Sequence, residues 1–262
     1  MSIELERGDI TTAQADAIVC GAGGALEQAL RRAGGPRLEQ AMALIKRPGV
    51  THAGDLHARF VIHTVVPTLE ERLGATYQAV FGQAAALGVS SIALPALGAA
   101  FHPYRVAKVA FDAAVESRIP DIRFWLHDDD TFHSFDQARL FRTPPLRAAR
   151  RTDWKTEPDP PLRPLAFETH LDAPAAATLA LGTVPEEMEN KWFVFQEGDT
   201  VNLYRSWTGI LVFRLTVTDG RLHDVQFNES QFKGTDEQAA ESLGHLVSWL
   251  AGRGDQRASP AS

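Results

Sequence analysis

The sequence predicts an α/β fold, a mixed sheet sandwiched by helices, followed by a smaller α+β domain with an antiparallel meander. Three observations support this prediction. Short apolar segments alternate with Ala- and Leu-rich segments in the first half of the chain. A proline-rich stretch then interrupts the pattern. Beyond it, strand-like segments follow one another directly, as antiparallel strands joined by short turns do.

Four short apolar segments in the first half are too short for helices, and we expect them to be buried strands that follow an opening strand. They are Ala17–Cys20, Phe60–Val66, Ser91–Leu94 and Ile122–Leu126. Helical segments lie between them, and glycine or proline marks their ends. They are Ala25–Ala33, which ends at Gly34–Gly35, Thr76–Leu87 and Val106–Ser117.

Prolines mark the boundary between the two predicted domains, because proline lacks the amide donor that a helix interior and a sheet ladder need. We expect a first domain at residues 1–142 and a semi-extended linker at 143–166. A small α+β domain then occupies residues 167–252, and residues 253–262 form a disordered tail. The prolines of the linker are Pro144, Pro145, Pro158, Pro160, Pro161 and Pro164.

The second domain is predicted to contain a helix at each end, Ala173–Leu181 and Asp236–Leu250, with Thr235 and Gln238 forming a capping box. Asp219–Gly220 is a strong two-residue hairpin signal. Four strands lie between the helices: Lys191–Glu197, Val201–Trp207, Ile210–Thr218 and Leu222–Asn228. The third strand alternates, and we expect one of its faces to hold Leu211, Phe213, Leu215 and Val217.

Composition excludes several classes of function. The 262 residues carry a net charge of −7, so duplex nucleic acid is not the expected partner. A single cysteine, Cys20, rules out an intrachain disulfide and a four-cysteine zinc site. The sequence shows no secretory signal and no apolar run of membrane-spanning length. We therefore expect a cytoplasmic protein without a metal, a cofactor or a membrane contact.

Three loops follow predicted strands, at the positions where open α/β sheets bind their ligands. They are Gly8–Thr11, Cys20–Gly24 and Pro95–Pro103. Glycine and small residues let a ligand approach the backbone, and a helix N-terminus favours a phosphate. Each loop alone is a weak signal, since an aspartate such as Asp9 is most often a turn former or a helix cap.

Taken together, in order and spacing, these segments resemble the macrodomain family. The resemblance covers Ile3 to Arg142 and implies a cleft along the edge of the sheet that binds ADP-ribose or a related nucleotide. The family's active hydrolases act on ADP-ribosyl bonds, so an ADP-ribosylated macromolecule is a further expected partner. The matching strings are GDIT, DAIV, AGG, GDL, FVIHTVVP, SIALPALG and HDDDTFHSF.

The resemblance implies a role for each matching position. Asp9 recognises the adenine amino group, Ile10 assists through its amide, and His127 lies where many members place an aromatic ring against adenine. A turn at residues 98–101 matches the diphosphate-binding loop, and the glycine turn precedes the first helix. The positions in these two turns are Gly98, Ala99, Ala100 and Phe101, and Cys20, Gly23 and Gly24.

Several positions depart from the family pattern. Active hydrolases usually have two asparagines after the segment that DAIV matches, and Cys20–Gly24 contains none. Leu26 stands where an acidic residue often follows the glycines. Ala100 replaces a glycine whose backbone angles can be closed to alanine and whose amide approaches a phosphate.

Three hypotheses therefore stay open for the first domain. It binds an ADP-ribose-like nucleotide through a divergent cleft, or it is a degenerate module kept for protein interaction or regulation. Alternatively it is a divergent ADP-ribosyl hydrolase, although we assign no catalytic residue. In that case a replacement acid or base would come from Glu27, His52, His57 or His102.

The string RSWTG at Arg205–Gly209 resembles a small domain that occurs alongside ADP-ribose-handling domains. Arg205 and Trp207 are two residues apart, so an extended strand would place them on one face. A guanidinium beside an indole can bind a phosphate and stack on a base. The alternative is a core tryptophan covered by the arginine stem.

Overall fold

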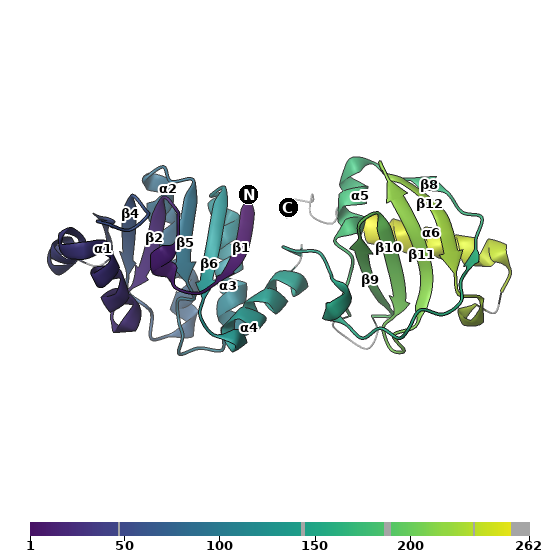
Figure 1. Ribbon diagram of the computed structural model, residues 1–262, viewed down its shortest axis with the longest axis horizontal. Helices are drawn as coiled ribbons and strands as arrows, with labels where there is room; N and C mark the ends of the chain where they lie inside the picture. The colour runs from purple at the N-terminus through teal and green to yellow at the C-terminus, as the bar shows by residue number, and fades with distance from the viewer. Residues whose placement is uncertain (47, 143–144, 186–189, 233, 253–262) are drawn as a thin grey trace. The chain divides into compact units, whose positions relative to one another are not determined.

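The computed structural model describes residues 1–46, 48–142, 145–185, 190–232 and 234–252 (Figure 1). The predicted tail at 253–262 lies outside the described residues. The chain divides into two compact units, Met1–Arg139 and Leu140–Ser262, and each is built around its own sheet. Across the described ranges, no helix is both long enough and apolar enough to cross a membrane.

The sheet of the first unit is mixed, as the sequence predicts. Its strand order is β1-β6-β5-β2-β4-β3, and every neighbouring pair is parallel except β3 and β4. All four predicted strands are present, together with an opening strand and the short strand β3. The strands are β1 (Ser2–Arg7), β2 (Ala17–Gly21), β3 (Gly49–His52), β4 (Phe60–Thr64), β5 (Ser91–Pro95) and β6 (Asp121–Leu126).

The three predicted helices correspond to α1 (Gly24–Leu44), α2 (Leu73–Ala86) and α3 (Pro103–Ser117). The predicted end of the first helix is a break within α1. Gly35 has a φ of 70° there, and the helical path resumes at Pro36. Glycine tolerates these angles and proline is favoured in a first helical turn, so Gly35–Pro36 joins two helical segments.

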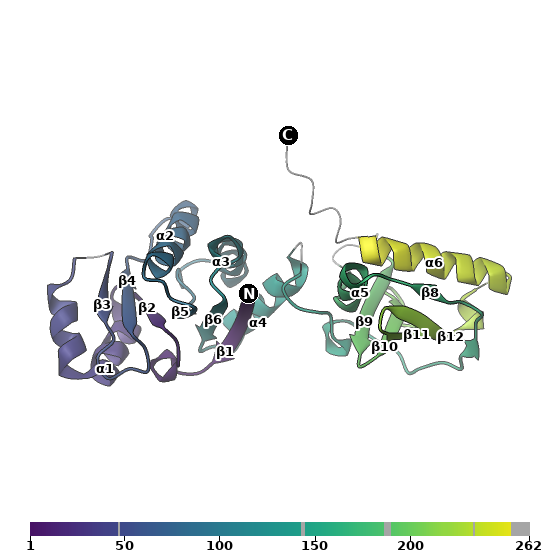
Figure 2. The same cartoon turned by 90° about the horizontal axis from the view of Figure 1, so that it is seen from above.

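Helices cover both faces of this sheet, with α2 and α3 side by side on one face and α1 on the other (Figure 2). Leu30 and Leu38 of α1 pack in one core cluster with Ile18 of β2. The helix α4 (Asp129–Phe141) was not predicted from the sequence. Its Phe135 ring contacts Phe111 of α3 and Phe124 of β6. These contacts give the layered α/β fold that the sequence indicates.

The second unit contains the predicted antiparallel meander, β9 (Trp192–Glu197), β10 (Thr200–Arg205), β11 (Leu211–Thr218) and β12 (Arg221–Phe227). The helices α5 (Ala173–Ala180) and α6 (Asp236–Gly252) lie together on one face of this sheet (Figure 2). The predicted hairpin turn is confirmed, because Asp219 and Gly220 both have positive φ, at 49° and 79°. The predicted capping box of α6 is present in the hydrogen bonds between Thr235 and Gln238.

A bulge in β11 changes the predicted alternation of that strand. Leu203 of β10 pairs with Phe213, while the next residue, Tyr204, pairs with Leu211, so Val212 is the extra residue. Phe213 and Leu215 therefore join the core cluster beneath α5 and α6, whereas Leu211 joins a different cluster. The expectation that all four apolar residues share one face is wrong at Leu211.

Residues 145–166 of the proline-rich stretch group with the second unit, which begins at Leu140. The buried Arg147 forms an ion pair of 2.7 Å with Asp153. Leu165 is buried in the core cluster beneath α5 and α6. The two-residue strand β7 (Arg163–Pro164) pairs with β12, and β8 (Thr169–His170) extends the same edge. The second unit thus begins before residue 167, the predicted start of the second domain. The reason is that proline excludes regular ladders but not side-chain packing.

Asp16 joins the N-terminal ends of β2 and β5. Its Oδ2 accepts hydrogen bonds of 2.8 Å from both the amide and the hydroxyl of Ser90, and one of 3.2 Å from the Ser91 amide. The Ser90 amide is the largest cause of the lowered pKa of Asp16, and the charge of Arg59 adds a smaller effect. A carboxyl group whose pKa is lowered by folding stabilises the fold above its unfolded value and loses this contribution as the pH falls.

We therefore expect Asp16→Ala to lower the free energy of unfolding at pH 7 by about 1–3 kcal/mol. The difference between the variant and the wild-type chain should shrink as the pH is lowered below 3.8, the ordinary pKa of the group. Urea unfolding followed by circular dichroism at several pH values measures this. Glu39→Gln on the exposed surface of α1 is the control. A difference that is independent of pH would contradict the assignment.

Candidate functional site

The first unit has a cavity of about 600 Å³ at the edge of the sheet where the parallel strands end. Strands β1, β6, β5, β2 and β4 run in the same direction, so the loops that follow them gather at one edge. The three loops singled out in the sequence all contribute residues to its lining, as do Trp125, His127 and Val66. Its volume lies within the range of about 300–1,000 Å³ that is typical of small-molecule sites.

Asp9 and Ile10 line this cavity, shortly after β1. Asp9 caps the short 3-10 helix η1 (Ile10–Thr12), and its Oδ1 accepts a hydrogen bond of 2.9 Å from the Thr11 amide. This bond fixes the carboxylate at the rim of the cavity and satisfies only part of its capacity, because a carboxylate can accept several hydrogen bonds. Asp9 is therefore both a cap and an exposed acceptor.

The glycine turn after β2 leads into α1. Gly23 lines the cavity, and its φ of +83°, like that of Gly24, is strained for any other residue. The Gly23 amide donates a hydrogen bond of 2.7 Å to Oε2 of Glu27, whose Oε1 accepts another of 2.8 Å from Arg31. A carboxylate of the protein thus already occupies the positive end of this helix.

Cys20 and Gly24 do not line the cavity. The Cys20 side chain is fully buried and packs in the core cluster that faces α1, together with Leu30 and Leu38. Neighbouring side chains of a strand point to opposite faces, and Cys20 belongs to the face that α1 covers. The expectation that Cys20 contacts a ligand is therefore not supported by its position.

The turn after β5 presents backbone amides to the cavity. Gly98 has a φ of +100°, and its carbonyl accepts a hydrogen bond of 2.9 Å from the Phe101 amide, which closes the turn. The buried Tyr77 hydroxyl accepts a bond of 2.8 Å from the Leu97 amide, and burial raises the pKa of this hydroxyl. In the described part of the chain, the amides of Ala99 and Ala100 donate to no protein acceptor.

Two predicted residues of this turn lie outside the cavity. Ala100 is exposed, and Phe101 lines a smaller neighbouring cavity of about 200 Å³. Ala100 is also absent from the described residues with positive φ, so its backbone is open to any side chain. The position that requires glycine is Gly98, which the sequence retains.

Trp125 is the aromatic residue of the site that sequence reasoning missed. It lies near the end of β6 and lines the cavity together with His127, whose side chain is exposed at 88%. The indole is partly buried, and its Nε1 has no hydrogen-bond partner among the described residues. The sequence does contain a signal for Trp125. It is two residues from His127, so both side chains point to the same face of an extended strand.

The cavity contains few groups that could act as an acid or a base. Asp9 and His127 are the ionisable side chains among the residues that line it. Glu27 caps α1 from its buried position, and His102 precedes α3 outside the cavity. His52 and His57 also lie outside the lining.

The predicted pair of Arg205 and Trp207 in the second unit does not form. Strand β10 ends at Arg205, and the Gly209 amide donates to the Arg205 carbonyl at 2.8 Å, which turns the chain. Trp207 is 59% exposed in this turn, so it is not a core tryptophan either. The indole beside Arg205 is that of Trp192, whose ring centre lies 4.3 Å from the guanidinium carbon.

Comparison with known proteins places the first unit among macro domains. The family model of the Macro domain matches residues 14–111. A macro domain-containing protein of Streptomyces coelicolor is 33% identical over 166 aligned residues, which cover 53% of this chain and 98% of the relative. A protein of Cronobacter sakazakii named O-acetyl-ADP-ribose deacetylase is 31% identical over 160 residues, covering 50% of this chain and 89% of that protein.

Solved macrodomains resemble about half of the chain. The Oceanobacillus iheyensis macrodomain with ADP gives a TM-score of 0.48 at 23% identity, and covers 52% of this chain and 89% of the other. The Trypanosoma brucei macrodomain in complex with ADP-ribose gives 0.49 at 24% identity, with coverages of 52% and 68%.

We expect Gly98→Ala to lower the free energy of unfolding by about 1–3 kcal/mol, because its φ is strained for alanine. Its new Cβ would also meet the Phe101 ring at 2.9 Å and Leu73 at 3.1 Å. Ala99→Gly, one position along the same turn, is the matched control and should cost less than 1 kcal/mol. Thermal and urea unfolding of the three chains measure this, and equal stabilities would refute the role of Gly98.

Proposed function

The chain belongs to the macrodomain family, and from that premise we propose that its first unit binds ADP-ribose or a closely related nucleotide in the cavity at the sheet edge. The observation that carries the proposal is the meeting of three kinds of group in one cavity. Asp9 supplies an acceptor, Trp125 an aromatic surface, and the turn at Gly98 supplies amides that donate to no acceptor in the described part of the chain.

The adenine would lie between the loop of Asp9 and the end of β6. A carboxylate fixed by the Thr11 amide is placed to accept from an exocyclic amine. Trp125 and His127 offer flat surfaces on which a purine ring can stack. The sequence assigned the stacking role to His127 alone, whereas the partly buried indole of Trp125 provides the larger and more rigid surface.

The diphosphate would be held by backbone amides and not by cations. No lysine or arginine is among the residues that line the cavity. Glu27 already occupies the first turn of α1, so a phosphate at that helix would face a carboxylate. The amides of Ala99 and Ala100 donate to no acceptor in the described part of the chain and are the donors that we assign to the diphosphate, and the conformation of Gly98 directs the turn that carries them.

A nucleotide attached to a macromolecule offers the same adenine and diphosphate groups. An ADP-ribosylated protein or nucleic acid is therefore a candidate partner that uses the same cavity. The interaction-module alternative differs because it requires no small molecule in the cavity at all. Calorimetry with free ADP-ribose separates these hypotheses.

We expect ADP-ribose to bind the full-length chain with a Kd in the micromolar range, about 8 kcal/mol of binding free energy. Asp9→Asn should raise the Kd tenfold or more. Asparagine is also a good helix cap, so this variant keeps an acceptor for the Thr11 amide while replacing one carboxylate oxygen with a donor. Isothermal titration calorimetry measures both values.

Asp130→Asn, an exposed position of α4 outside the cavity, is the matched control and should bind as the wild-type chain does. Absence of binding to the wild-type chain at millimolar ADP-ribose would overturn the proposal and favour the interaction module. Equal affinities of the Asp9→Asn variant and the wild-type chain would exclude the adenine role of Asp9.

We further expect no enzymatic turnover of O-acetyl-ADP-ribose at concentrations that saturate the cavity. Asp9 and His127 are the ionisable side chains in its lining, and we assign both to the adenine end of the ligand. Release of acetate is measured against a buffer blank. Turnover that His127→Gln abolishes while ADP-ribose binding persists would establish the divergent-hydrolase hypothesis instead.

A further inference from the structure

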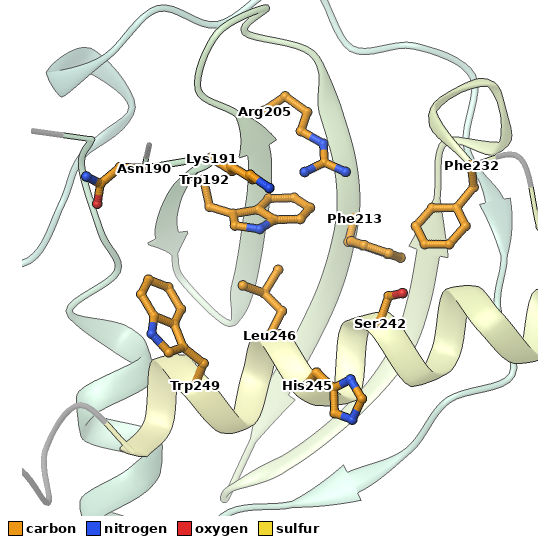
Figure 3. A pocket seen from close by; sticks show the side chains of 10 residues that line it. All are labelled: Asn190, Lys191, Trp192, Arg205, Phe213, Phe232, Ser242, His245, Leu246 and Trp249. Atoms are coloured by element: carbon orange, nitrogen blue, oxygen red, sulfur yellow. The ribbon is translucent and has the colours of Figure 1, made fainter. Parts of the chain in front are cut away.

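The second unit contains a cavity of its own, about 520 Å³ in volume, between α6 and the meander (Figure 3). Arg205 and Trp192 border it from β10 and β9, and Lys191 stands just before β9. Ser242 and Trp249 border it from α6. Its volume is within the range of about 300–1,000 Å³ that small-molecule sites occupy.

Arg205 is a cation without an acidic partner in the described part of the chain. Its guanidinium lies over the Trp192 ring, and partial burial lowers the pKa of the group. By contrast, Arg151, Arg163 and Arg214 of the same unit each contact a carboxylate. A guanidinium that is partly removed from water and has no counterion favours an incoming anion.

A second cation and a hydroxyl group lie in the same cavity. Lys191 is exposed, and Figure 3 shows that it extends, like Arg205, toward the Trp192 indole. Ser242 adds a neutral donor from α6. None of the residues that line the cavity is a carboxylate. The cavity is therefore locally positive in a chain whose net charge is −7.

Aromatic rings form much of the remaining wall. Trp192 and Phe213 lie with their ring centres 6.3 Å apart, and Phe232 contacts Phe213 at 5.9 Å. Trp249 is 51% exposed at the other end of the cavity. Exposed indole faces stack on flat rings, and such stacking contributes about 1–3 kcal/mol for a nucleobase.

We propose that this cavity binds a nucleoside phosphate, with the phosphate on Arg205 and Lys191 and the base against the indole of Trp192 or Trp249. Cations beside flat apolar rings indicate a ligand that carries both an anionic group and an aromatic ring. An inorganic anion would leave the rings unused, and an uncharged aromatic ligand would leave Arg205 without a counterion. This inference concerns the second unit alone and does not depend on the function proposed for the first.

The test uses the full-length chain with its first cavity blocked. Ala25 is exposed and lines that first cavity, so Ala25→Trp fills it with little disturbance of α1. Calorimetry in this background is carried out with AMP, ADP-ribose, inorganic phosphate and adenosine. We expect AMP to bind at one site, and phosphate and adenosine each to bind at least tenfold more weakly. Comparison of ADP-ribose with AMP shows whether the cavity prefers a nucleoside diphosphate or a nucleoside monophosphate. Tight binding of either one supports a nucleoside phosphate as the ligand.

Arg205→Met should weaken AMP binding tenfold or more, and Lys191→Met should weaken it less. Arg221→Met is the control, because Arg221 pairs with Glu168 on an exposed part of β12. The melting temperature of Arg205→Met should equal or exceed that of its parent, because the substitution removes a desolvated charge. A purely structural arginine would instead lower the melting temperature and leave the affinity unchanged.

Failure of both AMP and ADP-ribose to bind the Ala25→Trp chain at millimolar concentration would overturn the proposal. Equal losses of affinity in Arg205→Met and Arg221→Met would also overturn it, because they would indicate nonspecific attraction. Either result leaves the function of the first unit untouched, since that function is tested by the loss of ADP-ribose affinity in Asp9→Asn, a residue of the first cavity only.

Discussion

The parallel pairing of β1, β6, β5, β2 and β4 is the constraint on which the first cavity depends. Parallel strands bring their carboxyl ends to one edge, so loops that are distant in sequence become neighbours. Asp9 after β1, Gly98 after β5 and Trp125 at the end of β6 meet only for this reason. Asp16 contributes to the same arrangement from the opposite edge, where its carboxylate joins the N-terminal ends of β2 and β5.

Two charged side chains of α1 near the first cavity are paired with each other. Glu27 satisfies the Gly23 amide at the start of α1, and Arg31 holds Glu27 in place. The positive end of the helix is thereby neutralised from within the protein. The amides of Ala99 and Ala100 in the Gly98 turn donate to no acceptor in the described part of the chain, and no lysine or arginine lines the cavity.

The second unit, unlike the first, has a cavity that is lined by cations. Its cavity joins Arg205 and Lys191 to aromatic walls, with no carboxylate in the lining. The other face of its sheet is covered by the proline-rich stretch, where Ala149 and Leu162 pack against Phe193 and its neighbours. Prolines prevent this stretch from forming long regular elements, but its side chains contribute to a core. The two units thus contain cavities of different chemical character.

The sequence by itself determined the layered α/β architecture, the meander and the loops that bear the first site, because these follow from local periodicity and turn chemistry. It singled out Asp9, Gly98 and His127, which line the first cavity. Only the tertiary structure decided which neighbours of these residues face the cavity. Cys20 turns into the core and Ala100 falls outside the lining. Strand pairing and helix packing, which are long-range contacts, bring Trp125 to the first cavity and Trp192 to the second. The two-residue spacing from His127 already placed Trp125 on the same face of its strand, but it did not show that this face borders a cavity.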